Sequence, residues 1–220
     1  MIKILFFLIT LLVVIMSCSL TDDCPEGINK LPMYGKVKKC ASQIQSDNNF
    51  IKLCTNNYKG DLKEAAKHFV KRGWQYFYQN KPDTAMMRFN QAWLLDSLNA
   101  ETYWGFANLT GMQQKYKESL PLFERALTLA PNNAKIWESA SNSYGNLYVQ
   151  TNDRIYLNKS IECLKQANHL EPGKARTNAS LASAYTYYTQ RDSARKYLKI
   201  ADDIDKSAVD PAIRNAVNGN

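Results

Sequence analysis

A repeat with a period of 34 residues is the feature that most limits how this chain of 220 residues can fold. The stretches 66–99 and 100–133 are adjacent and in register. Large or small residues recur at matching positions in the two stretches: Phe69 and Tyr103, Gly73 and Ala107, Ala85 and Ser119, Phe89 and Phe123, and Ala92 and Ala126. Such a period is the signature of a solenoid, in which each unit buries its apolar face against the next. With 9 Gly and 7 Pro, the composition also favours helices over turn-rich sheets.

The positions of these residues resemble the signature of the tetratricopeptide (TPR) superfamily. Two further units fit it less regularly. The third, 134–174, has Trp137, Ala140, Ser141, Tyr144, Ser160, Leu164, Ala167 and Pro172. Its second half comes late, and we expect the insertion at about 149–153, in the loop between its two helices. The fourth, 175–208, has Leu181, Ala182, Tyr185, Ala194, Leu198 and Ala201.

This resemblance implies an all-α fold: an α-solenoid of four helix-turn-helix repeats within 61–209, opened by a capping box at Asp61. Residues 18–60 are expected to form a linker and a helical cap, with a separate binding element as the alternative. Two short helices are predicted there, at about 36–45 and 49–56. Asp210 and Pro211 predict a capping helix in 210–220, because they supply an N-cap and a first-turn proline.

The N-terminus has the pattern of an export signal. A lysine at position 3 precedes an apolar run from Ile4 to Met16, which is too short to span a bilayer. The run ends in Ile15-Met16-Ser17-Cys18, which resembles a bacterial lipobox. We therefore expect residues 1–17 to be a signal peptide and Cys18 to carry lipid; an ordinary signal peptide is the alternative. Ser19 and the acidic pair at 22–23 resemble sorting signals, which favours the outer membrane of a bacterial cell envelope, facing the periplasm or the surface.

Charge and motifs exclude several classes of function. The formal net charge is +8, but the basic residues are interspersed with acidic ones, so no nucleic-acid partner is expected. The two histidines, His68 and His169, each have an ordinary place on a predicted repeat helix, and no phosphate-binding loop is present in the sequence. We therefore expect no enzymatic activity, no cofactor and no small-molecule substrate.

Four cysteines remain after Cys18, and in an exported protein they allow disulfides. Cys40 and Cys54 are spaced symmetrically about Ser46–Asn48, so if that segment turns the chain, the two predicted short helices bring them together. This predicts a Cys40–Cys54 bridge, with two buried free thiols as the alternative; the states of Cys24 and Cys163 stay open. No Cys-x-x-Cys motif and no zinc-finger spacing is present, so no metal is expected.

In the TPR superfamily the first helix of each repeat lines a concave groove. By this resemblance Trp74 and Trp104, at groove positions of neighbouring repeats, and Tyr78, one turn after Trp74, form an aromatic patch. Its margin is formed by Lys67, Lys71 and Asn108. Aromatic residues surrounded by polar groups are typical of binding hot spots. The alternative is that the segment Leu31-Pro32-Met33-Tyr34 covers these rings and makes them part of the core.

Together these features predict a lipid-anchored interaction scaffold of the cell envelope that binds a peptide or protein in its groove. The run Arg88–Asp96 and the segment Tyr103–Phe106 further resemble a group of small bacterial TPR lipoproteins. Two alternatives remain open: an assembly factor or pilot lipoprotein for an outer-membrane or surface complex, and a passive structural subunit.

Overall fold

The computed structural model describes residues 23–219, which form ten α-helices and three short 3-10 segments. The helices are α1 (Ala41–Asn57), α2 (Leu62–Tyr78), α3 (Pro82–Leu95), α4 (Ala100–Met112), α5 (Tyr116–Leu129), α6 (Ala134–Thr151), α7 (Arg154–Leu170), α8 (Ala175–Tyr187), α9 (Arg191–Asp205) and α10 (Pro211–Asn218). The 3-10 segments are η1 (Ile28–Lys30), η2 (Pro32–Lys36) and η3 (Lys206–Ala208). The predicted signal peptide and Cys18 lie outside the described residues.

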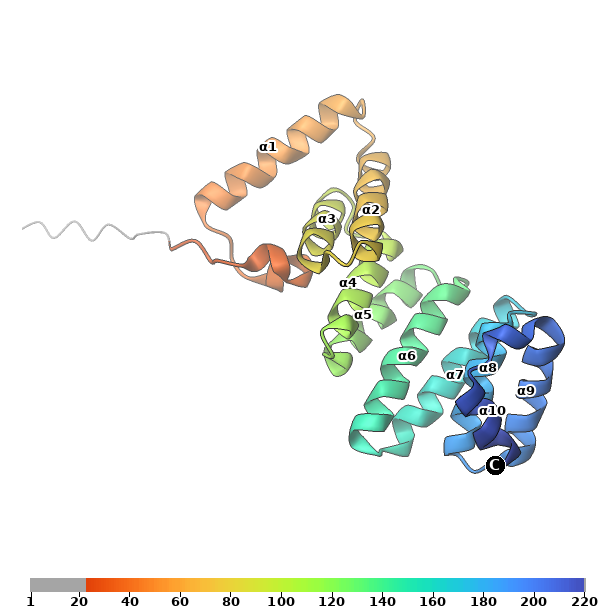
Figure 1. The fold of residues 1–220 in the computed structure, drawn as a ribbon. Helices are drawn as coiled ribbons and strands as arrows, with labels where there is room; N and C mark the ends of the chain where they lie inside the picture. Colours follow the sequence, from red (N-terminus) through yellow and green to blue (C-terminus); the bar gives the residue numbers. More distant parts are fainter. Residues whose placement is uncertain (1–22, 220) are drawn as a thin grey trace, which may run out of the picture.

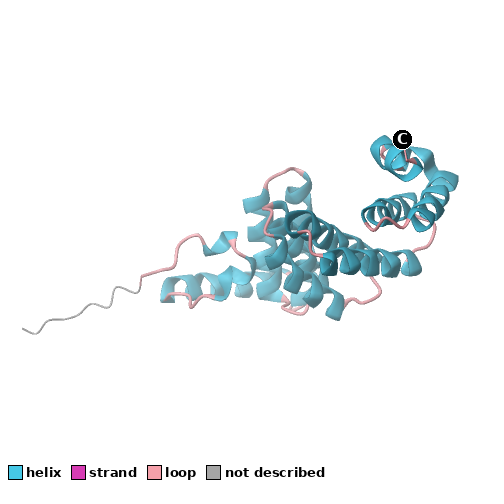
Figure 2. Ribbon diagram, turned by 90° about the horizontal axis from the view of Figure 1, so that it is seen from below, coloured by secondary structure: helices cyan, strands magenta, loops and turns pink. Residues whose placement is uncertain are grey.

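The helices pair in chain order, α2 with α3, α4 with α5, α6 with α7 and α8 with α9, and successive pairs stack into a solenoid (Figures 1 and 2). Side-chain caps open several of these helices: Asp61, Asn99, Asn133, Asp153 and Asp210 each accept a backbone N–H from the helix that follows. The predicted all-α solenoid of four helix pairs is thus confirmed. Within residues 23–219, no helix is both long enough and apolar enough to cross a bilayer.

The insertion in the third unit lengthens helices instead of a loop. Helix α6 has 18 residues and α7 has 17, against 13 in α4 and 14 in α5. Only Asn152 and Asp153 separate α6 from α7. The expected insertion in the connecting loop is therefore wrong, because the added residues continue the helical hydrogen-bonding pattern of both helices.

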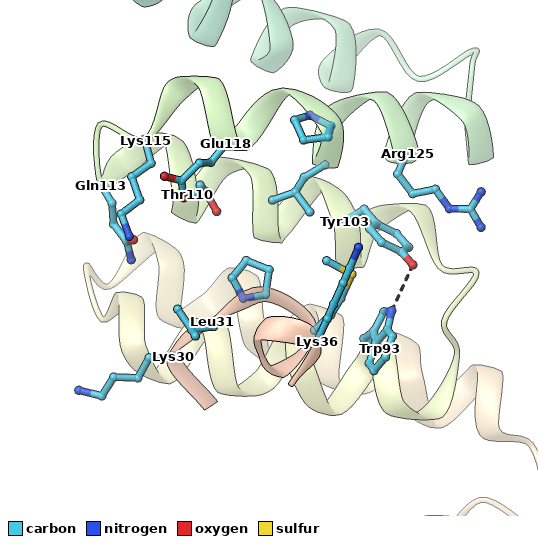
Figure 3. Close-up of a pocket in the computed structure, with 14 residues that line it drawn as sticks. Lys30, Leu31, Lys36, Trp93, Tyr103, Thr110, Gln113, Lys115, Glu118 and Arg125 are labelled. Atoms are coloured by element: carbon cyan, nitrogen blue, oxygen red, sulfur yellow. Dashed lines mark hydrogen bonds between the residues drawn. The ribbon is translucent and has the colours of Figure 1, made fainter. Parts of the chain in front are cut away.

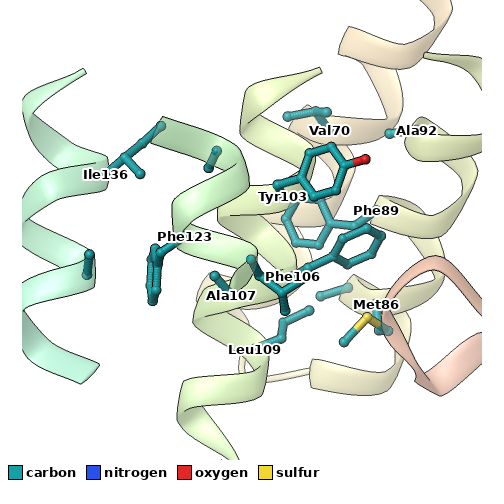
Figure 4. Packing of buried hydrophobic residues seen from close by; sticks show 14 of the residues in the cluster. Val70, Met86, Phe89, Ala92, Tyr103, Phe106, Ala107, Leu109, Phe123 and Ile136 are labelled. Carbon is teal, nitrogen blue, oxygen red and sulfur yellow. The ribbon is translucent and has the colours of Figure 1, made fainter. Parts of the chain in front are cut away.

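The largest core cluster lies between the first three helix pairs (Figure 4). Its centre is Phe89 of α3, which is fully buried. Gly73 of α2 and Gly105 of α4 face this ring so closely that an added Cβ would lie 2.6 Å and 2.4 Å from it. The two glycines let neighbouring helices close over a large side chain, and burying such a side chain contributes about 1.5–3 kcal/mol.

A helix caps each end of the solenoid. At the C-terminal end, α10 packs on α8 and α9, with Val217 buried and Arg214 2.5 Å from Asp202. At the other end, Phe50, Ile51 and Cys54 in the C-terminal half of α1 pack against α2 and Leu95. The first half of α1 extends away from the solenoid (Figure 1), and Ile44 on it is 48% exposed.

The N-terminal segment differs from expectation in its helices and in its disulfide. One helix, α1, replaces the two predicted short helices, because Ser46 and Asp47 find partners without a turn: the Ser46 hydroxyl donates to the Ser42 carbonyl (2.9 Å), and Asp47 pairs with Lys39 (2.5 Å). Cys40 and Cys54 then lie at opposite ends of α1, about 20 Å apart at 1.5 Å per residue, too far for a bridge. The structure pairs Cys40 with Cys24 instead, and Cys54 and Cys163 are buried free thiols.

Candidate protein-binding groove

The structure brings the three predicted groove aromatics together on α2 and α4. The ring centroids of Trp74 and Trp104 are 4.5 Å apart, and those of Trp74 and Tyr78 are 6.1 Å apart. We call these three residues the aromatic cluster. The rings of Trp74 and Tyr78 stack because residues four apart lie on one face of a helix, while Trp104 comes from the neighbouring repeat.

The members of the aromatic cluster differ in how firmly they are held. Trp74 is half-buried and packs edge-on against Phe89 of the core (5.4 Å between centroids). Trp104 is also half-buried, and its Nε1 donates a hydrogen bond to the Ser139 hydroxyl (2.9 Å). Tyr78 is 78% exposed. The two indoles therefore form a fixed platform, and Tyr78 offers an exposed ring beside it.

Three connected hollows run along the face formed by α2, α4, α6 and α8; we call this face the groove. The first hollow, about 620 Å³, is lined by α2 from Lys67 to Tyr78 and by the start of α4. The second, about 350 Å³, shares Tyr78 with the first and includes Trp104. The third, about 270 Å³, shares Asn142 and Ser180 with the second and extends to α10. The aromatic cluster lies where the first two hollows meet.

The predicted polar margin is only partly at the groove. Lys67 and Lys71 line the first hollow. Lys67 pairs with Glu64 (3.1 Å), and this hydrogen bond raises the pKa of the Lys67 ammonium. Asn108 lines neither hollow beside the cluster, and its amide donates to the carbonyl of Trp104 in its own helix (2.8 Å).

The segment Leu31–Tyr34 leaves the aromatic cluster uncovered, so the alternative in which it buries these rings is wrong. Asn90 of α3, which is fully buried, holds the segment elsewhere. Its Nδ2 donates to the carbonyls of Asn29 (3.0 Å) and Leu31 (2.9 Å), and its Oδ1 accepts from the Tyr34 N–H (3.3 Å). The segment therefore packs on α3, and none of its residues lines the hollows beside the rings.

The second hollow also has a charged part that was not predicted from the sequence; it is formed by Lys135, Glu138, Lys174 and Arg176. The Thr177 hydroxyl donates to Glu138, and Lys174 pairs with Glu171 (2.5 Å), a contact that raises the pKa of Lys174 and lowers that of Glu171. Lys135, Glu138 and Arg176 occupy repeat positions that face the groove, so the rule that identified Trp104 could have found them too.

The titratable groups elsewhere point to structural roles. Burial raises the pKa of the Cys163 thiol to about 12, so at neutral pH it is a protonated core residue and not a nucleophile. Burial also raises the pKa of Cys54. Within residues 23–219, no three potential metal ligands cluster together. What the described groove offers is an apolar platform next to charged and hydroxyl groups, which suits binding of a polypeptide.

Comparison with solved structures identifies the fold. No family model matches the chain, and no curated protein matches its sequence. A crystal structure of MamA is similar with a TM-score of 0.57 and 21% identity over 78% of this chain and 97% of that one. A thermophilic TPR protein of Thermus thermophilus is similar with a TM-score of 0.57 and 22% identity, over 70% of this chain and 80% of that one. PilF of Pseudomonas aeruginosa is similar with a TM-score of 0.60 and 18% identity, over 72% of this chain and 68% of that one. At these identities the likeness concerns the fold alone: the solenoid of helix pairs in this chain is similar to the folds of these three proteins, one of which is a TPR protein.

Proposed function

We propose that this protein is a lipid-anchored scaffold of the bacterial cell envelope that binds a protein or peptide partner in its groove. The aromatic cluster carries the proposal. It combines a fixed pair of indoles with an exposed tyrosine at the junction of two hollows, and residues 31–34 leave it open. Rigid aromatic anchors of this kind dominate the energetics of most protein interfaces.

The charged groups of the groove support selectivity for a partner. Lys67 and Lys71 flank the cluster on one side, and Lys135 and Arg176 lie in the hollow on the other. Charges at the rim of an interface influence association rate and choice of partner more than affinity. Because Glu138 lies among these cations, the groove fits a segment with an apolar side chain for the cluster and polar groups of mixed charge on either side.

A photo-crosslinking amino acid in place of Tyr78 tests this proposal in intact cells. Tyr78 is exposed, so the replacement leaves the fold unchanged, and we expect it to crosslink to a defined partner. A crosslinker at Lys117, which is exposed on α5 and lines none of the three groove hollows, is the matched control. The same crosslinked partner at both positions, or none at Tyr78, would argue against the groove.

Membrane attachment is tested separately. The apolar run and the lipobox-like residues before Cys18 support acylation of that cysteine. Cys18→Ala is expected to move the protein from the detergent phase into the aqueous phase, because the buried acyl methylenes provide the binding energy. Membrane retention of that variant would contradict the proposed anchor and leave the groove proposal intact.

A further inference from the structure

A fourth hollow lies outside the groove, between residues 30–36 of the N-terminal segment and α5 (Figure 3). Its volume is about 540 Å³. Its side walls are Leu31, Pro32 and Met33 of the segment, and Pro121 and Leu122 of α5. It shares no residue with the three groove hollows.

The floor of this hollow is apolar although both of its aromatic residues carry a polar atom. Trp93 Nε1 donates to the Tyr103 hydroxyl (3.1 Å), which in turn donates to the carbonyl of Ser97 (3.0 Å). The dashed line in Figure 3 marks the first of these bonds. Because these donors are already bonded within the protein, the floor offers ring surface to an occupant.

Two features that disfavour stability face each other across the hollow. On one side, four consecutive residues from Met33 to Lys36 have φ between 54° and 67°, a left-handed turn that L-residues rarely adopt. On the other side, Pro121 lies inside α5 and cannot donate to the carbonyl one turn earlier. Strained elements that are held in place often mark binding sites.

The left-handed turn is held firmly. Tyr34, at its centre, is buried against Trp93, and the ammonium of Lys39 lies 3.2 Å from the centroid of its ring. Asn90 binds the turn from α3, and the Cys24–Cys40 disulfide closes the whole segment into a loop. The wall that carries Met33 and Lys36 is therefore preorganised.

The charges around the hollow are mainly positive. In Figure 3, Lys30 and Lys115 lie at one end, together with Glu118, while Lys36 lies beside the Tyr103 and Trp93 rings and Arg125 lies at the far end. Lys30 pairs with Asp83 (2.6 Å), whereas the other three cations form no ion pair within the described residues. Glu118 is the one carboxylate among the lining residues.

We propose that this hollow binds an extended acidic segment of a partner protein. One apolar side chain of that segment inserts between the proline-containing walls, over the Trp93 and Tyr103 rings. Carboxylates on either side of it meet the cations at the two ends, where charge complementarity favours association and excludes basic sequences. The site is separate from the groove, so one copy of the chain can hold two segments.

Three labelled peptides that share a central leucine test this site on the full chain in detergent. One is flanked by Glu and Asp, one by Ser and Gly, and one by Lys. Fluorescence anisotropy is expected to show binding of the acidic peptide alone, with a Kd of roughly 0.1 mM or lower. Because the charges are at the surface, raising the salt concentration from roughly 50 mM to roughly 500 mM should weaken binding of the acidic peptide severalfold. No binding of the acidic peptide, or equal binding of the other two, would overturn the proposal.

Matched variants locate the binding. The double variant Lys36→Glu with Arg125→Glu should raise the Kd of the acidic peptide by about tenfold or more. Lys52→Glu with Lys63→Glu makes the same change of net charge at exposed sites of α1 and α2 and should have little effect. Tyr78→Ala should leave this affinity unchanged; a loss in Tyr78→Ala without a loss in the first pair would place the peptide in the groove and refute the second site.

Discussion

Gly105→Ala is expected to destabilise the protein, although the same change usually stabilises a helix. Alanine in a helix interior is favoured over glycine by about 0.5–1 kcal/mol. Gly105 lies in the interior of α4, where a Cβ would come within 2.4 Å of the fully buried Phe89 ring. Real Cβ atoms do not approach that closely, so either the ring or α4 must move.

The cost of that movement exceeds the gain in helix propensity. Overpacking a well-filled core costs about 1–3 kcal/mol, and Phe89 has little room to move because Gly73 lies on its other side, at 2.6 Å from an added Cβ. We therefore expect Gly105→Ala to lower the free energy of unfolding by about 1–2 kcal/mol. Phe89→Leu in the same chain should recover part of this loss, because it removes ring atoms at the point of contact.

Gly145→Ala in α6 is the matched control, because its Cβ would lie 3.6 Å from the nearest atom, the Ser160 hydroxyl oxygen, an ordinary contact. It should raise the free energy of unfolding by about 0.5–1 kcal/mol. Urea denaturation followed by circular dichroism measures both variants. If Gly105→Ala proves as stabilising as Gly145→Ala, the close packing of α2, α3 and α4 around Phe89 is refuted.

Three further predictions concern the N-terminal segment and the core. Asn90→Ala removes three hydrogen bonds to Asn29, Leu31 and Tyr34, so it should lower the free energy of unfolding by about 2–4 kcal/mol. It should also speed amide hydrogen exchange in residues 29–34, and unchanged exchange there would contradict the role of Asn90. Peptide mapping without reduction should find Cys24 linked to Cys40, and replacing both by Ser should cost about 3 kcal/mol. Burial keeps Cys163 protonated in the folded chain up to about pH 12, whereas the unfolded chain releases this proton above about pH 9. The free energy of unfolding should therefore fall between pH 9 and 12, and it should fall less in Cys163→Val.

The repeat positions made much of the fold predictable. Phe89, Phe123 and the small residues around them are spaced for helix pairing, and the same spacing placed Trp74 and Trp104 on neighbouring first helices. These inferences succeed because each repeat contacts mainly its neighbours, so local pattern determines packing. Gly105 was not identified, since it lies outside the signature positions and matters through one contact with Phe89.

The N-terminal segment could not be derived in the same way. Its polar residues 46–48 suggest a turn, but Asp47 pairs with Lys39 and Ser46 bonds Ser42 within a continuous helix. Because the helix does not turn back, Cys40 and Cys54 lie too far apart to form the predicted bridge. The docking of the segment depends on Asn90, which is about 60 residues away in the chain. No periodicity connects these parts, so only the three-dimensional structure shows that they meet.

The most direct test of the groove is the affinity of the crosslinked partner for Tyr78→Ala, measured together with the stability of that variant. Tyr78 is 78% exposed, so its replacement should change the free energy of unfolding by less than about 0.5 kcal/mol. If the aromatic cluster anchors the partner, the Kd should rise by about tenfold or more, while the exposed control Lys117→Ala leaves it unchanged. An unchanged Kd in Tyr78→Ala would contradict binding at this cluster.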